Sequence, residues 1–199
     1  RNPPSTPVPA WPPMRDRLQS ALNNVYTVLR DVGAPSVLGG GWTTAISIRT
    51  GFDDDIVTRA TVARNWIGTL GIDEAMYIMA QVDENGVALT GERRYTRRLA
   101  PGARPQIAAF WSITVYRRSD CLLVDNPINR HSISDRTPAI VPDADGGLTI
   151  SIQAKEPGAG VNWLPAPPGE QFYLTLRLYQ PKRAHLDGTF TYPAVQCVD

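Results

Sequence analysis

The second half of the chain consists of short runs in which apolar and polar residues alternate, separated by turn-forming residues. In the last run, residues 172–179, Phe and Leu at the even positions alternate with Tyr, Thr, Arg and Tyr at the odd positions. A repeat of two places successive side chains on opposite faces of a β-strand, so one face is buried and the other is polar or aromatic. The pattern predicts an antiparallel sheet that covers a core with one face.

Earlier runs have the same character and together indicate a β-domain. They span residues 76–82, 94–99, 107–116, 122–124 and 148–153. Strong turn signals, such as Glu84-Asn85-Gly86 and the loop 143–147, lie between them. Short strands at this spacing are typical of sandwiches and jelly rolls. We therefore predict a mainly β fold with N-terminal helices, in which residues 74–199 form an antiparallel β-sandwich of jelly-roll type.

The residues before this domain have a different pattern. Residues 1–12 are predicted to be a Pro-rich linker, and residues 13–73 a helical extension with one short strand at 42–49. The linker leads us to expect a signal peptide, an anchor or another domain upstream of Arg1. We expect a periplasmic, secreted or membrane-anchored extracytoplasmic protein, and a cytoplasmic location stays open.

Two helices are predicted in the extension. Apolar residues three or four positions apart predict an amphipathic helix over 13–32 that ends at Gly33. Its apolar stripe needs a surface to cover, so we expect it to pack on the main domain or to drive homo-oligomerisation. A second helix is predicted over 56–70, with Gly71 as its stop. The carboxylates of Asp53–Asp55 cap this helix better than they form a metal site.

Composition and charge exclude two classes of partner. The net charge is +1, and the arginines are scattered rather than aligned along one stripe, so we expect no nucleic acid. No run of 18 apolar residues is present, so we expect no membrane span in this chain. Two cysteines, Cys121 and Cys197, leave two alternatives open: a disulfide that ties the C-terminal tail to the core, or two free thiols.

A series of motifs in one order resembles a known family. The motifs are Glu74-Ala75-Met76-Tyr77, Asp83-Glu84-Asn85-Gly86, Gly91-Glu92-Arg93-Arg94-Tyr95, Phe110-Trp111-Ser112-Ile113-Thr114-Val115-Tyr116, Asn126-Pro127-Ile128-Asn129-Arg130, Asn162-Trp163-Leu164-Pro165, Leu176-Arg177-Leu178-Tyr179 and Leu186-Asp187-Gly188-Thr189. They resemble the domain of unknown function 1214, which often ends longer bacterial proteins that begin with the domain of unknown function 1254. The resemblance covers about residues 74–195.

This resemblance implies a β-sandwich of jelly-roll type, often in exported proteins, and implies no particular reaction. The sequence departs from the family at one position. His131 stands where the family usually has Tyr after Asn129-Arg130, which adds a titratable ring.

The sequence contains no recognisable catalytic or metal-binding motif. The two histidines, His131 and His185, are not accompanied by a nucleophile signature, and the catalytic residues stay unknown. Cysteines and histidines are too few and too dispersed for zinc, and a plain turn at 143–147 is a better interpretation than a Ca²⁺ loop. A glycosidase could use Asp125, Asp135, Glu156 or Asp187, which are candidates by residue type alone. We expect no metal and no cofactor.

The polar segment 125–136 is the candidate site, and two interpretations are open. Its Asn and Arg side chains can fasten the loop to the sheet. Alternatively, Arg130 or Arg136 binds an anion while Asn126 or Asn129 binds a hydroxyl group. The expected lining of such a pocket also includes Trp111, His131 and Trp163, whose rings would stack on a sugar if they were not core residues.

The sequence supports hypotheses from two classes of function. The first is a non-catalytic binding or assembly module of the cell envelope, with a small polar or carbohydrate ligand. The alternative is an enzyme, such as a hydrolase, that acts on a carbohydrate-like or small polar substrate.

Overall fold

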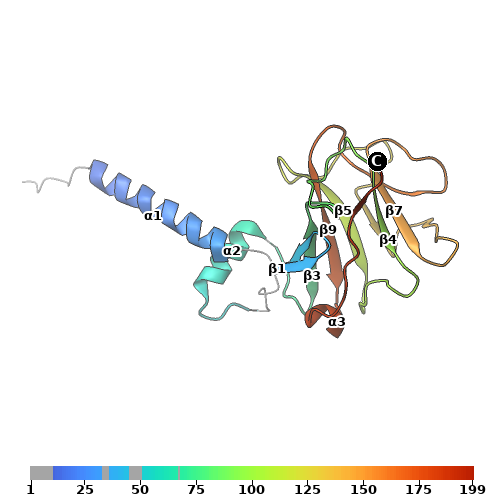
Figure 1. Cartoon of the computed structure of the whole chain (residues 1–199). Helices are drawn as coiled ribbons and strands as arrows, with labels where there is room; N and C mark the ends of the chain where they lie inside the picture. The colour runs from blue at the N-terminus through green and yellow to red at the C-terminus, as the bar shows by residue number, and fades with distance from the viewer. Residues whose placement is uncertain (1–10, 33–35, 45–50, 67) are drawn as a thin grey trace, which may run out of the picture. The chain divides into compact units, whose positions relative to one another are not determined.

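The chain forms two compact units. The computed structural model describes residues 11–32, 36–44, 51–66 and 68–199 (Figure 1). The first unit contains helices α1 (Trp11–Val32) and α2 (Ile56–Asn65). The second contains all the described strands and the short helix α3 (Arg183–Leu186).

Helix α1 confirms the predicted amphipathic helix and begins two residues earlier than expected. Trp11 and Pro12 are helical, so the predicted linker is wrong at these two positions; residues 1–10 and Gly33 lie outside the described residues. On the apolar stripe Leu29 is buried, whereas Met14 and Leu18 are more than half exposed. Homo-oligomerisation through this stripe stays a prediction.

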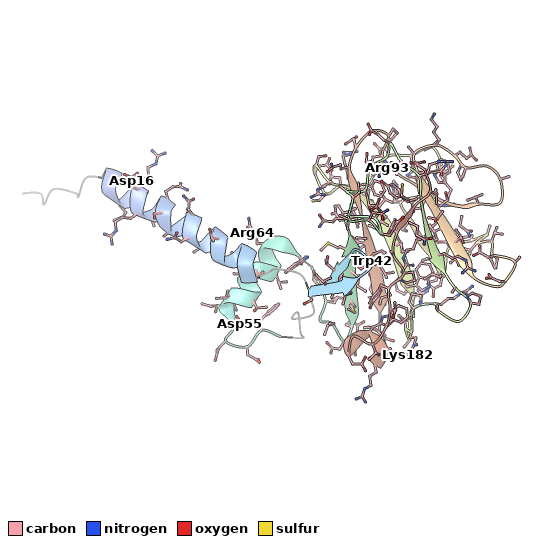
Figure 2. The ribbon with its side chains drawn as sticks, viewed as in Figure 1. Asp16, Trp42, Asp55, Arg64, Arg93 and Lys182 are labelled. Atoms are coloured by element: carbon pink, nitrogen blue, oxygen red, sulfur yellow. The ribbon has the colours of Figure 1, made fainter. Side chains whose placement is uncertain are left out.

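Helix α2 begins at the predicted capping carboxylate. This residue is Asp55, which lies next to α2 (Figure 2). It accepts hydrogen bonds from the hydroxyl of Thr58 at 2.6 Å and from the backbone N–H of Thr58 at 2.9 Å. These two bonds hold the pKa of Asp55 below its usual range. Asp53 and Asp54 lie before this cap, and Asp53 has a positive φ of 42°.

The end of α2 differs from the prediction. The helix stops at Asn65 because Trp66 leaves the helical conformation, with φ −143° and ψ 45°. Gly68 then adopts φ +79°, a left-handed conformation that suits glycine after a helix end. The predicted continuation to residue 70 and the stop at Gly71 are therefore wrong.

Two sheets make up the second unit (Figure 1). The larger has the strand order β1-β2-β3-β9-β5-β6, with bounds Ser36–Gly39, Trp42–Thr44, Ala75–Ala80, Phe172–Tyr179, Trp111–Arg117 and Ser132–Ser134. The smaller has the order β10-β4-β7-β8, with bounds Gln196–Cys197, Tyr95–Leu99, Leu148–Gln153 and Asn162–Pro165. The pairs within the larger sheet are antiparallel, and β2 joins it by pairing with β3.

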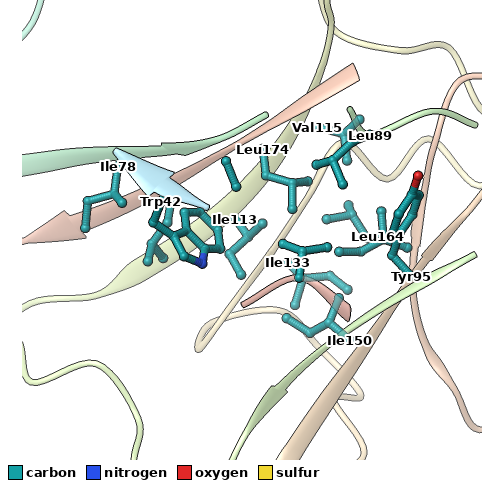
Figure 3. Packing of buried hydrophobic residues seen from close by; sticks show 14 of the residues in the cluster. Trp42, Ile78, Leu89, Tyr95, Ile113, Val115, Ile133, Ile150, Leu164 and Leu174 are labelled. Atoms are coloured by element: carbon teal, nitrogen blue, oxygen red, sulfur yellow. The ribbon is translucent and has the colours of Figure 1, made fainter. Parts of the chain in front are cut away.

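One apolar core lies between the two sheets (Figure 3). In the larger sheet Leu176 of β9 pairs with Ile78 of β3 and Ile113 of β5, and all three are fully buried. The same core includes Ile150 and Leu164 from the smaller sheet. The predicted mainly β sandwich is therefore confirmed.

Most strands that the alternation predicts are present. Strands β7 and β9 have the predicted bounds, and β3, β4 and β5 cover most of the predicted runs. The run 122–124 is wrong as a strand: Leu123 forms only an isolated bridge with Tyr116, because Cys121 at φ +61° turns the chain just before it. Of the run 42–49, residues 42–44 are β2, and residues 45–49 lie outside the described residues.

Strand β8 departs from the purely antiparallel prediction because it pairs with β7 in the parallel direction. All four of its residues are buried, so it has no alternation by which the sequence could reveal it. On its other side β7 pairs with β4, and β4 pairs in turn with β10. Next to this last pair Arg94 forms an ion pair with Asp199 at 2.8 Å.

Cys121 and Cys197 are both free in the structure. Of the two alternatives left open by the sequence, the structure therefore has two free thiols and no disulfide.

Substitution of Gly91 is expected to destabilise the sandwich. A Cβ atom at this glycine would overlap the backbone carbonyl of Pro167, and backbone atoms cannot rotate away as a side chain does. We expect Gly91→Ala to lower the free energy of unfolding by about 3 kcal/mol in urea titrations. Gly102→Ala, at a glycine with φ +74° and no neighbouring atom within 4 Å, should cost only ~1 kcal/mol. Equal costs for the two variants would contradict this prediction.

Candidate functional site

The loop that carries the sequence-predicted site is held by its own side chains. Asn126 donates from Nδ2 to the carbonyl oxygens of Val124 and Arg130, both at 3.0 Å. Its Oδ1 accepts the backbone N–H of Arg130 at 2.8 Å. A single amide thus closes the chain reversal by satisfying three backbone groups.

His131 and Arg130 extend this network. The Nδ1 atom of His131 lies 3.0 Å from the carbonyl of Val124, and Nε2 lies 3.1 Å from Oδ1 of Asn129. Asn129 itself has a positive φ of 50°. Arg130 donates from Nη1 to the carbonyl oxygen of Trp163 at 3.0 Å, which ties the loop to β8. The structure therefore places Arg130 next to Trp163, as the sequence suggests. The contact is with the backbone carbonyl of Trp163 and not with its ring.

The two tryptophans of the predicted site are core residues. Trp111 is 2% exposed and Trp163 is 4% exposed. The indole Nε1 of Trp163 donates to the carbonyl of Gln153 at 2.8 Å, and the backbone N–H of Trp111 donates to Asp135 at 3.2 Å. These positions favour the structural interpretation, because neither ring is presented to a ligand.

The loop 143–147 is a tight turn, as predicted. Gly146 donates its N–H to the carbonyl of Asp143 at 2.8 Å, and the N–H of Gly147 donates to the Asp145 side chain at 2.9 Å. Arg98 forms ion pairs with both carboxylates. The two acids therefore share the single positive charge of a side chain of β4.

Arg136 lies elsewhere, on an aromatic stack outside the core. Its guanidinium is 4.2 Å from the ring of Phe110. Phe110 in turn stacks on Tyr179 with a centroid distance of 4.1 Å and an interplanar angle of 15°. Because Tyr179 is an odd-numbered residue of β9, this stack belongs to the sheet face that points away from the core.

The same face carries a second stack and an arginine. Tyr173 and Tyr116 stack at 5.4 Å, and Arg177 donates to the Tyr116 hydroxyl at 2.8 Å and to the Thr114 hydroxyl at 3.1 Å. Arg177 also lies 5.9 Å from the ring of Tyr77. Burial, and then the Cys121 thiol, raises the pKa of Tyr173.

We call this surface the aromatic face. It comprises Tyr77, Phe110, Tyr116, Arg136, Tyr173, Arg177 and Tyr179. Arg177 forms no ion pair with any described residue. Of the residues predicted for the site, the face contains Arg136 alone. Its other members were visible in the sequence as the polar or aromatic set of the run 172–179 or as parts of the family motifs, neither of which marked them as a site.

The second histidine lies inside the fold. His185 of α3 is 2% exposed, and its Nε2 accepts the backbone N–H of Gln106 at 3.0 Å. Its Nδ1 lies 2.7 Å from the hydroxyl of Tyr192. Burial lowers the pKa of His185 to about 4, so the ring is neutral at pH 7.

Two sheets around one core, with a polar and aromatic outer face, define a protein of the β-sandwich class. A family profile described as "Protein of unknown function (DUF1214)" matches residues 74–183, just over half of the chain. The chain belongs to this family, as the motifs indicated. No curated protein matches the sequence.

One solved structure supports the fold. The VPA0106 protein from Vibrio parahaemolyticus is 23% identical with a TM-score of 0.67, over 98% of this chain and 47% of that one. An uncharacterised protein from Burkholderia cenocepacia is 14% identical with a TM-score of 0.40, over 96% of this chain and 44% of that one. The chain thus spans about half the length of these proteins. None of the described helices is long and apolar enough to cross a membrane.

Removal of the Asn126 amide should destabilise the loop. Asn126→Ala leaves the N–H of Arg130 and two carbonyls without their partner, and we expect a loss of about 2 kcal/mol in the free energy of unfolding. The control is Asn85→Ala, at an exposed turn position. This variant should change the free energy of unfolding by less than ~0.5 kcal/mol. Unchanged stability of Asn126→Ala would mean that the loop is held by other contacts.

The neutral His185 predicts a loss of stability in acid. The pKa of a histidine is 6.5 in the unfolded chain, and that of His185 is about 4 in the fold. Between these values the unfolded chain takes up a proton that the folded chain does not, so the free energy of unfolding falls as pH falls. The slope is at most about 1.4 kcal/mol per pH unit, and the contribution is fully present above pH 6.5.

Urea titrations from pH 7 to pH 4 measure this effect. We expect His185→Gln to lose less stability than the wild type over this interval. Parallel curves for the wild type and His185→Gln would contradict the assignment.

Proposed function

We propose that this chain is a non-catalytic binding module that works outside the cytoplasm and recognises an acidic, carbohydrate-like ligand on the aromatic face. The observation that carries the proposal is Arg177, a guanidinium with no carboxylate partner among the described residues, beside Tyr77 and Tyr116. The extracytoplasmic location rests on what the family resemblance implies.

The spacing of the aromatic face suits an extended ligand. One stack contains Tyr173 and the other Tyr179, six residues apart on β9, which corresponds to about 20 Å along a strand. Arg177 lies between these two positions. Tyrosine rings combine an apolar face with a polar edge, so they suit sugar rings, which have both kinds of surface.

Arg177 provides the preference for an acidic ligand. Its contacts with Thr114 and Tyr116 are made to neutral oxygens, so its positive charge is not compensated by them. A guanidinium fork binds a carboxylate through two parallel hydrogen bonds. A sugar acid therefore satisfies the arginine and the aromatic rings together.

The bonding of the two histidines favours a binding module over the alternative hydrolase. His131 contacts Asn126, Asn129 and a backbone carbonyl, and His185 contacts Tyr192 and a backbone N–H. Neither histidine is hydrogen-bonded to a serine or cysteine side chain, which is the nucleophile that a catalytic histidine activates.

Calorimetric titration with oligogalacturonides, and with neutral galactose oligomers of equal length, tests the proposal. We expect the acidic oligomers to bind more tightly than the neutral ones. Arg177→Leu should weaken binding of the acidic oligomers at least tenfold and remove the difference between the two, whereas Tyr173→Ala should weaken both.

Arg93→Leu is the matched control, because it removes the same charge from an exposed arginine that precedes β4 in the smaller sheet. It should retain wild-type binding. Circular dichroism melting curves establish that each variant is folded. Absence of binding by the wild type, or unchanged binding by folded Arg177→Leu, would overturn the proposal.

A further inference from the structure

A second arginine lies inside the sandwich. Strand β4 alternates, and its inward side chains are Tyr95, Arg97 and Leu99, each with 0% exposure. Arg97 pairs in register with Ile150 of β7, which is part of the core (Figure 3). The guanidinium therefore occupies a position where the pattern of the strand calls for an apolar side chain.

This guanidinium is without hydrogen-bond partners. None of its three nitrogen atoms donates a hydrogen bond, and Arg97 forms no ion pair with any described residue. Its directed contact is with the ring of Trp42, 5.1 Å away. Burial lowers the pKa of Arg97 to about 10, so it is still a cation at neutral pH. A buried charge without a partner is costly, which points to a counter-ion.

Tyr192 supplies a second, weakly satisfied donor on the segment that Trp42 also contacts, since the indole N–H of Trp42 donates to the carbonyl of the next residue, Pro193. Because Gln106 donates to Nε2 of the neutral His185, the ring proton is on Nδ1 and is donated to the Tyr192 oxygen at 2.7 Å. The hydroxyl of Tyr192 therefore donates its own proton to another atom. That acceptor is the sulfur of Met76 at 3.9 Å, and a thioether sulfur accepts only weakly.

Tyr192 is not itself the counter-ion. Burial raises its pKa, so it is a neutral phenol. A cation and a neutral O–H donor together match a monoanion better than a dianion.

We propose that Arg97 and Tyr192 form a buried binding position for a small monocarboxylate. The guanidinium fork binds the two carboxylate oxygens, and the Tyr192 hydroxyl donates to one of them. Trp42 provides the wall on which the guanidinium rests. This position is separate from the aromatic face, since the two lie on opposite sides of the larger sheet.

The segment that carries Tyr192 is fixed over the β1–β2 turn. Trp42 donates from Nε1 to the carbonyl of Pro193 at 2.8 Å. A Cβ atom at Gly40 would lie 2.9 Å from the carbonyl oxygen of Tyr192, so only glycine allows this approach. The hairpin therefore positions the hydroxyl as well as the indole ring.

Melting temperatures of the full chain, dialysed free of carboxylates, test the site with acetate as the probe. Chloride and phosphate at matched ionic strength are the other arms. We expect acetate alone to raise the melting temperature, with saturation, because a ligand that binds the folded state stabilises it. Arg97→Leu should abolish the response, whereas Arg118→Leu and Arg177→Leu should retain it.

Two further measurements apply if Arg97→Leu does not fold. Tyr192→Phe keeps the ring and removes the hydroxyl, and it should weaken acetate binding about five- to tenfold. In the wild type, the arginine Nε–H resonance that is absent in Arg97→Lys should shift on titration with acetate. An equal effect of chloride, or no acetate effect on either the melting temperature or this resonance, would overturn the proposal and leave Arg97 as a structural cation held by Trp42.

Discussion

The register of β9 is the constraint on which the rest of the sandwich depends. This strand is hydrogen-bonded to β3 on one side and to β5 on the other, so it fixes the position of both neighbours. Its even-numbered residues are fully buried, and its odd-numbered residues include Tyr173 and Arg177 on the outer face. A slip of one residue would exchange the two sets, which would remove the core and the aromatic face at once.

The sequence predicts the parts of this fold that alternate and fails where alternation is absent. The runs at 148–153 and 172–179 were predicted with the correct bounds because in each an apolar, buried set alternates with a polar or aromatic set. Strand β8 was missed because all its residues are buried, and β6 and β10 because two or three residues are too few to reveal a period. The network around Asn126 was expected as one of two interpretations, but which carbonyls it binds depends on tertiary contacts.

Arg97 illustrates a different limit of prediction. In the sequence it is one of a pair with Arg98, and such pairs are usually solvated. Yet Tyr95 and Leu99 lie two residues to either side, and a period of two places Arg97 with them in the core. Charge favoured the exposed interpretation and position favoured the buried one. The fold resolves the conflict by turning Arg98 outward to Asp143 and Asp145 while Arg97 is enclosed.

Strand β10 consists of two residues, yet it decides what the edge of the smaller sheet presents to other molecules. Gln196 and Cys197 occupy the hydrogen-bonding positions beside Thr96 and Tyr95, and a carboxylate of Glu84 accepts the N–H of Cys197 at 2.9 Å. An uncovered edge strand is a template on which another polypeptide can add by backbone pairing. Gln196 and Cys197 thus occupy the edge of β4 on which such pairing would otherwise take place.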